Sequence, residues 1–278
     1  MSGRRKFHYE HPYKHVRGQV KDYQTITLDI EAQVAVLRLN RPDKMNALST
    51  QMRAEITDAI GVASANARAI VITGNGKAFC SGQDLSDSGD LSELDLERVL
   101  RDEYKPMLRA IGDCPVPTIC AVNGPAAGAG ANLALTADVV IAAHGAYFLQ
   151  AFTRIGLMPD AGGTFWLPRQ MGAAKAMGAA LFAEPISAQQ ADDWGMIWEA
   201  VPDDAFEAQW RKRAAHLARG PSVAYGSLKK AIRGTWDNEL ATQLDLEAQL
   251  QGECGASRDF KEGVLAFLEK RAPRYEGR

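Results

Sequence analysis

Two glycine-rich stretches and one aspartate have residue types and spacings that could do chemistry. The first stretch spans residues 76–85 (GKAFCSGQDL) and the second spans residues 124–133 (GPAAGAGANL). Small residues let other groups approach the backbone closely, so N–H groups in such turns can bind an anion or a developing oxyanion. Either turn alone is typical of an ordinary loop. If each gives one donor to the same carbonyl oxygen, the pair forms an oxyanion hole, in which one donor is worth about 3 kcal/mol of barrier.

The aspartate, Asp160, lies in segment 155–164 (IGLMPDAGGT). It can be interpreted as the N-cap of a helix that has Gly162 and Gly163 in its first turn. It can also be interpreted as a lone general acid or base whose pKa is raised by mostly apolar surroundings. The segment by itself leaves both interpretations open.

Two other kinds of site are disfavoured. The second glycine-rich stretch follows a predicted strand and opens a predicted helix, as a dinucleotide-binding turn does. However, the third glycine of that fingerprint would fall at Leu133, and no acidic residue ends a second strand about 20 residues later. None of the five histidines lies in a serine hydrolase or zinc peptidase motif. We therefore expect no metal site and no separate cofactor.

The composition is that of an ordinary globular protein. The 278 residues are 46% hydrophobic and 24% charged, which favours one α/β core with a helical appendage. A net charge of −2 and a pI near 6.2 give no basic field, so nucleic acid is not expected as a partner. The four cysteines have no Cys-x-x-Cys spacing, which favours reduced thiols and a cytoplasmic location.

One uncharged segment, residues 114–137, is long enough to cross a bilayer. Prolines and asparagines interrupt it, and most of its other residues are alanine and glycine, which contribute little transfer free energy. We therefore predict a buried strand, turn and helix here, and no contact with a membrane.

The apolar patterns predict the elements that must hold these residues. Strands are expected over residues 25–30, 34–40, 69–73, 117–122 and 139–142, with the first two paired. Ser49 is expected to cap a helix that separates the second strand from the third. Strand–helix alternation favours a largely parallel core with right-handed crossovers.

Helices are expected to dominate after Ser187, which opens a predicted capping box with Gln190. The last helix is predicted over residues 259–270, and the apolar stripes of these helices must be covered by the core or by another subunit. We therefore divide the chain into three parts, which are a polar N-terminal arm over residues 1–22, a core over 23–200 and a helical trimerisation region over 201–278.

The order and spacing of the motifs resemble the enoyl-CoA hydratase/isomerase, or crotonase, superfamily from about residue 23 to the C-terminus. The matching motifs are NRP at 40–42, NAL at 46–48, the first glycine-rich stretch, PTICAVNG at 117–124, AD at 137–138, GLMPDAGG at 156–163 and LPR at 167–169 with Gly172. The resemblance implies a spiral of ββα repeats with a C-terminal helical region, a homotrimer or homohexamer, and an acyl-coenzyme A thioester as substrate, of which coenzyme A is a part.

The resemblance also implies roles for individual residues. The backbone N–H groups of Gln83 and Ala129 would form the oxyanion hole, and Asp160 would be the acid–base group. The remaining positions implied to contact the substrate are Lys44, Asn46, Ala47, Lys77, Phe79, Gly82, Asp84, Leu85, Gly128, Asn132, Phe152, Pro159, Gly162, Phe267 and Lys270. Asn132 is expected to be a polar lining group, and the helix end with Phe267 to close the site or to reach a neighbouring subunit.

Two departures from the family pattern narrow the expected reaction. Hydratases of this superfamily use two glutamates to add water, and the matching positions are Asn132 and Phe152. Neither side chain can transfer a proton, whereas moving a double bond through an enolate needs only Asp160. The C-terminal third is similar to the ring-1,2-epoxyphenylacetyl-CoA isomerases of phenylacetate catabolism, which also shift 3-enoyl-CoA to 2-enoyl-CoA. The alternatives are an enoyl-CoA hydratase of fatty-acid β-oxidation and a non-catalytic acyl-CoA-binding or RNA-binding protein with this fold.

Overall fold

The computed structural model describes residues 21–86 and 95–278, so the predicted N-terminal arm lies almost wholly outside the described residues. The core is a six-stranded sheet in the order β1-β2-β3-β4-β6-β9, in which β1 and β2 are antiparallel and the other neighbours are parallel. The strands are β1 (Ile26–Glu31), β2 (Val34–Leu39), β3 (Ala69–Gly74), β4 (Thr118–Val122), β6 (Val139–Ala143) and β9 (Glu199–Val201). The predicted parallel core and its paired first strands are confirmed.

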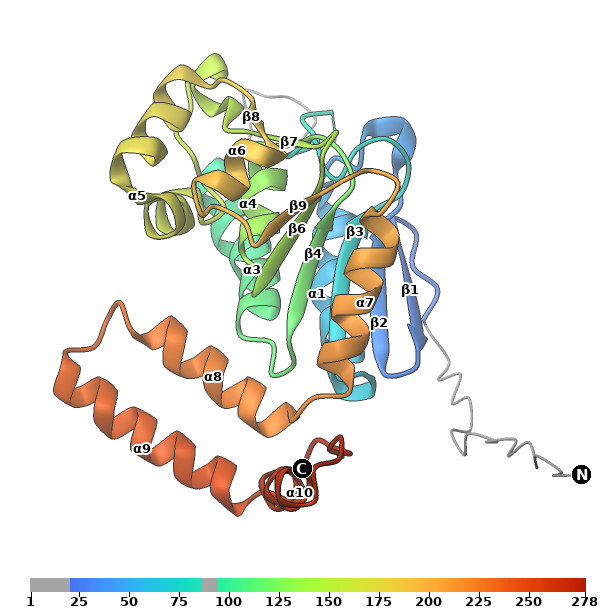
Figure 1. The fold of residues 1–278 in the computed structure, drawn as a ribbon. Helices are drawn as coiled ribbons and strands as arrows, with labels where there is room; N and C mark the ends of the chain where they lie inside the picture. The colour runs from blue at the N-terminus through green and yellow to red at the C-terminus, as the bar shows by residue number, and fades with distance from the viewer. Residues whose placement is uncertain (1–20, 87–94) are drawn as a thin grey trace, which may run out of the picture.

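Helices cover both faces of this sheet (Figure 1). One face packs on α1 (Thr50–Asn66) and α4 (Ala129–Leu135), with α3 (Lys105–Gly112) packed against α1, and the other face packs on α7 (Phe206–Ala218). The predicted cap of α1 is confirmed, because the Ser49 side chain accepts a hydrogen bond of 3.2 Å from the Met52 N–H. The structure therefore has the α/β architecture that the sequence predicts.

A π-helical turn interrupts the helix that enters α3. The helix α2 (Leu96–Val99) runs through the π turn Leu100–Tyr104 (η3) directly into α3. Pro106, in the first turn of α3, has no N–H to continue the regular hydrogen-bond ladder, which gives a local reason for the wider turn. The turn ends at Tyr104, whose side chain is buried.

A small second sheet lies beside the main one and bears on the site. It has the order β5-β7-β8, with β5 (Ala126–Ala127), β7 (Tyr147–Leu149) and β8 (Ile186–Ser187). The 3-10 turn Ala151–Ile155 (η4) and α5 (Gly163–Phe182) follow β7, and α6 (Ala188–Asp193) follows β8. The predicted capping box at the start of α6 is present, with Ser187 and Gln190 bonded to each other's backbone N–H groups.

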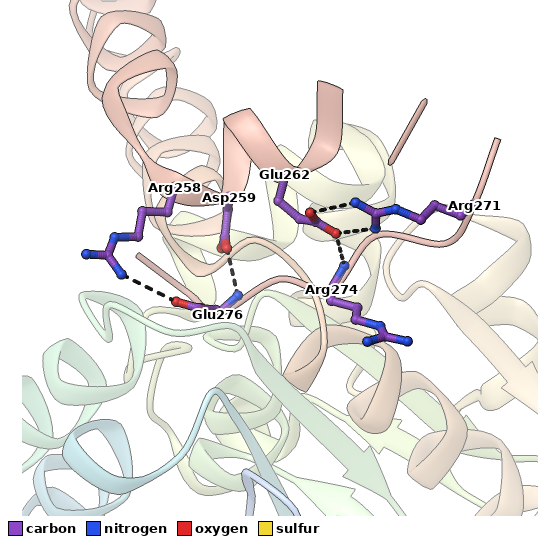
Figure 2. Close-up of a pocket in the computed structure, with 6 residues that line it drawn as sticks. All are labelled: Arg258, Asp259, Glu262, Arg271, Arg274 and Glu276. Carbon is purple, nitrogen blue, oxygen red and sulfur yellow. Dashed lines mark hydrogen bonds and ion pairs between the residues drawn. The ribbon is translucent and has the colours of Figure 1, made fainter. Parts of the chain in front are cut away.

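The last three helices form an arm that extends from the core (Figure 1). These are α8 (Ser222–Gly234), α9 (Leu240–Ala256) and α10 (Arg258–Leu268). The C-terminal tail folds back on α10, where Asp259 accepts the N–H groups of Glu276 and Gly277 and Glu262 pairs with Arg271 (Figure 2). Among the described residues, no helix is long and apolar enough to cross a bilayer.

Candidate active site

The two glycine-rich turns are in direct contact at the carboxyl ends of β3 and β4. The Ala127 N–H donates to the Cys80 carbonyl at 2.9 Å, and the Cys80 N–H donates to the Pro125 carbonyl at 3.2 Å. A Cβ atom on Gly82 would lie 2.8 Å from the Ala127 oxygen, and one on Gly130 would lie 2.4 Å from the Cys80 oxygen. Only glycine therefore allows this approach at either position.

This contact brings together the two N–H groups predicted to form the oxyanion hole. Ala129 is the first residue of α4, so its N–H has no acceptor within the helix. The Leu48 backbone pairs with the two residues that flank Gln83: its N–H donates to the Gly82 carbonyl, and its carbonyl accepts from the Asp84 N–H. The Gln83 N–H itself has no acceptor in the described part of the chain. The Ala129 nitrogen lies only 3.5 Å from the point where a Cβ on Gly82 would be.

Asp160 is not an N-cap, so that interpretation is wrong. The helix α5 begins at Gly163, and its N-cap is Gly162, which has a left-handed φ of 87° that favours glycine. The Asp160 side chain is half-buried, and its Oδ1 atom is buried without a hydrogen-bond partner among the described residues. Burial raises the pKa of this carboxyl to about 6, so Asp160 is a far stronger base than a solvated aspartate.

Asn132 holds the loop of Asp160 through a side chain that has no accessible surface, so it does not have the predicted role of a polar lining group. Its side chain is fully buried, with Nδ2 donating to the Asp160 carbonyl at 2.8 Å. Its Oδ1 accepts from Gln150 at 2.9 Å. A Cβ on Gly163 would lie 2.4 Å from Nδ2, so the first residue of α5 must be glycine for this amide to fit.

No second free carboxylate accompanies Asp160 in the described site. Phe152 is 7% exposed, and its ring lies 3.8 Å from the Cβ position of Gly128, whose φ is 53°. The Asp84 carboxylate forms an ion pair of 2.7 Å with Arg41 and accepts from Ser86. Burial alone would raise the pKa of Asp84, but the hydrogen bonds from Ser86 and Arg41 lower it. This carboxylate is therefore ionised and already paired, and it is not a free base.

Of the residues predicted to contact coenzyme A, some are exposed and others are buried. Lys44 and Lys77 are exposed, and their turns touch, because a Cβ on Gly76 would lie 2.9 Å from the Pro42 Cβ. Leu85, at the end of the first glycine-rich stretch, is 48% exposed. Two positive charges on adjacent turns suit the phosphates of coenzyme A.

Other predicted contacts are buried, and their side chains cannot meet a ligand. Asn46 is fully buried and donates to the carbonyls of Asn75 and Ala78, so it holds the two turns together. Phe79 is fully buried in the main hydrophobic core. Ala47 and Pro159 are also buried. The side chains of Asn46 and Phe79 are therefore structural, and the predicted contact at these two positions can be made only by their backbones.

The helix end with Phe267 and Lys270 lies far from Asp160 of the same chain. Arg68, just before β3, binds the carbonyl of Tyr275 in the C-terminal tail, whereas the glycine-rich turns follow the other end of β3. Figure 1 shows α10 at the opposite end of the sheet from β7 and β8. Phe267 is 82% exposed there. It cannot close the site of its own chain in this arrangement, and only the predicted reach to a neighbouring subunit remains.

Sequence reasoning missed a buried cluster that supports the first turn. Arg53 is 3% exposed and donates to the Leu48 carbonyl at 2.7 Å, and Leu48 in turn pairs with the Gln83 turn. Its guanidinium also donates to Glu103 at 3.0 Å and lies 4.8 Å from the centre of the Tyr104 ring. The available signal was an arginine beside the apolar face of a predicted helix, which requires a buried partner.

Comparisons with known proteins agree with this geometry. The family model described as Enoyl-CoA hydratase/isomerase matches residues 29–278. The chain is 63% identical to a "Probable enoyl-CoA hydratase" of Rhodobacter capsulatus, over 92% of this chain and 99% of the relative. It is 43% identical to the 1,2-epoxyphenylacetyl-CoA isomerase of Escherichia coli, over 90% of this chain and 97% of the relative.

Solved structures show the same fold. The crystal structure of an enoyl-CoA hydratase from Bacillus anthracis matches with a TM-score of 0.85 and 32% identity, covering 92% of this chain and 100% of that one. The family match covers most of the chain and agrees with the touching turns, whose Gln83 and Ala129 N–H groups have no acceptor among the described residues. The protein belongs to the enoyl-CoA hydratase/isomerase, or crotonase, superfamily and is an acyl-CoA hydratase or isomerase with the crotonase fold.

Proposed function

We propose that this protein is an acyl-CoA isomerase. It shifts the double bond of a 3-enoyl-CoA to position 2, and it converts 1,2-epoxyphenylacetyl-CoA to oxepin-CoA in phenylacetate catabolism. The observation that carries the proposal is the single half-buried carboxylate, Asp160, whose pKa is raised to about 6, in a described site where Asn132 is fully engaged and Phe152 is apolar. One base is sufficient for a proton shift, whereas the family's hydration route uses two carboxylates.

The mechanism follows from the free groups of the site. The N–H groups of Gln83 and Ala129 bind the thioester oxygen and stabilise the negative charge that develops on it. Asp160 removes a proton from the carbon next to the thioester, the double bond moves, and the resulting carboxylic acid returns the proton to the far end of the allylic system. Atoms and charge balance without water. Lys44 and Lys77 bind phosphates of the coenzyme A part.

The second candidate function is hydration, which the relative in Rhodobacter capsulatus favours by its name and its 63% identity. It would require a second proton-transfer group to activate water, in addition to Asp160. Its signature is a 3-hydroxyacyl-CoA product. In either case we propose a cytoplasmic homotrimer or homohexamer, in which the arm of each chain meets a neighbour.

The first experiment compares the wild type with Asp160→Asn on a 3-enoyl-CoA, following the conjugated 2-enoyl thioester by its absorbance. The variant keeps the size of the side chain and removes the base, so we expect kcat to fall by about 10³-fold. Asp193→Asn is the matched control, because Asp193 is exposed and its side chain accepts a hydrogen bond from Gln189 on its own helix. Equal rates for wild type and Asp160→Asn would remove Asp160 as the base, and a 3-hydroxyacyl product would favour the hydratase.

A further inference from the structure

Arg233, in the last turn of α8, joins the arm to two elements that support the site. Its Nη2 atom donates to the Asp138 carboxylate at 2.8 Å and to the Thr136 carbonyl at 3.1 Å, directly after the end of α4. The same guanidinium lies 5.4 Å from the centre of the Trp166 ring, in the first turn of α5. One partly buried arginine therefore contacts the end of α4 and the start of α5 together.

The Trp166 ring packs on the backbone that follows Asp160. A Cβ atom on Gly162 would lie 3.1 Å from Cδ1 and Nε1 of the indole, so the ring is in close contact with this residue. The Trp166 N–H donates to the Gly162 carbonyl at 2.9 Å. The next residue, Gly163, donates its N–H to the Asp160 carbonyl at 2.8 Å. A displacement of the ring would therefore move the backbone of Asp160.

A second route from Arg233 to Asp160 runs through α4. Arg233 donates to the Thr136 carbonyl, and the Thr136 hydroxyl donates to the Asn132 carbonyl, one turn earlier, at 3.0 Å. The Asn132 side chain in turn donates to the Asp160 carbonyl at 2.8 Å. A cation at the C-terminal end of a helix also interacts favourably with the helix dipole. Both routes from Arg233 end on the backbone of Asp160.

The start of α5 makes another contact with the arm, just beyond the end of α8. The Arg169 guanidinium lies 3.6 Å from the centre of the Phe165 ring and 5.5 Å from the centre of the Trp236 ring. Trp236 is two residues after the end of α8. Contacts between a guanidinium and an aromatic face are attractive, so two such contacts link the position of the arm to the position of α5.

Arg233 lies at the opposite end of α4 from the proposed oxyanion-hole donor. Ala129 is the first residue of α4 and Thr136 is its C-cap, which separates them by about 10 Å of helix. Lys229, one turn earlier on α8, also pairs with the Asp138 carboxylate, at 2.6 Å. Loss of the Arg233 guanidinium should therefore leave Asp138 paired and the oxyanion hole in place.

We propose that Arg233 is a positioning residue for Asp160, and that through Trp166 and α4 it holds the carboxylate where the substrate proton is removed. The inference deepens the proposed function and rests on Asp160 as the base. It makes the position of the base depend on how the arm lies against the core. A misplaced base slows proton transfer with little effect on substrate binding, since a displacement of about 1 Å can cost about 10²-fold in rate.

The test measures kcat and KM of Arg233→Gln with a 3-enoyl-CoA. Glutamine keeps a polar group beside Asp138 and removes the cation near Trp166, so we expect kcat to fall by at least about 10-fold and KM to change by less than about 2-fold. Lys229→Gln is the matched control and should keep the wild-type kcat, because it removes the other cation of α8 from the same carboxylate. If Arg233→Gln does not fold, Trp166→Phe reduces the same contact from the core side and should lower kcat in the same way.

A second comparison separates positioning from a general effect on the fold. In the Asp160→Asn background, Arg233→Gln should cause no further loss of the residual activity, because the base that it positions is gone. The inference alone fails if Asp160→Asn is inactive while Arg233→Gln keeps the wild-type kcat, if Lys229→Gln loses as much activity, or if the two losses multiply in the double variant. Full activity in Asp160→Asn would contradict the proposed function, and the inference would fall with it.

Discussion

At the scale of single residues, the properties of Asp160 come from what surrounds it. Asn132 and the Gly163 N–H hold its backbone carbonyl, each at 2.8 Å, while its Oδ1 atom receives no hydrogen bond in the described structure. A carboxylate that is partly desolvated and unpaired binds a proton more tightly than one in water. The backbone is therefore fixed and the side chain is left reactive.

This arrangement predicts the pH dependence of the reaction. The proposed isomerisation starts with ionised Asp160, and burial raises the pKa of this carboxyl to about 6, so kcat/KM should rise as the pH increases through about 6 and level off above 7. An activity profile of a 3-enoyl-CoA between pH 4.5 and 8.5 measures it. A midpoint of the wild-type pH profile near 4 would mean that the carboxyl is solvated in the working enzyme. The pH profile of the residual Asp160→Asn activity should show no transition near pH 6.

The predicted site residues Asn46 and Asn132 have side chains that serve the structure, and the reason is the same for both. Asn46 belongs to a family motif, yet its amide bonds the Asn75 and Ala78 carbonyls, and Asn132 similarly bonds the Asp160 carbonyl. A sequence motif marks a position near a site without distinguishing a residue that meets the ligand from one that holds the loop.

At the scale of elements, the proposed oxyanion hole depends on how closely the two glycine-rich turns approach each other. The sequence predicted each turn, and it predicted the longer strands β1 to β4 and β6 from their apolar runs. It did not predict β5, β7, β8 or β9, which are two or three residues long and too short to show an alternation of apolar and polar residues. Nor did it predict the π turn at Leu100–Tyr104, since nothing in its composition departs from a regular helix.

The approach of the turns can be tested with two helical glycines. A Cβ on Gly130 would lie 2.4 Å from the Cys80 oxygen, so Gly130→Ala must push the turns apart and should lower kcat by at least about 10²-fold. A Cβ on Gly61, inside α1, meets nothing within 4 Å, so Gly61→Ala should keep full activity and gain about 0.5–1 kcal/mol of stability. Steady-state kinetics and urea denaturation of both variants distinguish the two cases. Full activity in Gly130→Ala would mean that the hole does not depend on this contact.

At the scale of the whole molecule, the arm leaves a large apolar surface uncovered. The exposed apolar side chains of α8 to α10 line a groove between these helices or lie beside it, and they include Leu228, Ile232, Leu240, Leu244, Phe260, Val264, Phe267 and Leu268. Ion pairs of Lys229 and Arg233 with Asp138 join the arm to the core at one end. An isolated chain would be expected to associate through such a surface.

We therefore expect a solution mass of three or six times the 30.2 kDa chain, measured by light scattering after size exclusion. Phe267→Asp, which places a charge on the 82% exposed position of α10, should lower that mass and the activity together. Ala65→Asp, at the exposed end of α1, introduces the same charge outside the arm and should change neither. A monomeric, fully active wild type would contradict the prediction that a neighbour completes the site.

The uncovered arm has a consequence for how the enzyme responds to dilution. If the apolar faces of α8 to α10 are covered only by other chains, part of the free energy that keeps the arm folded comes from association and follows mass action. Melting temperature and specific activity would then depend on enzyme concentration. The steepness of that dependence would reflect the number of chains in the assembly. Because polar contacts such as those of Asp138 and Arg68 attach the arm to the core, the loss of neighbours on dilution would loosen the arm first and leave the sheet intact.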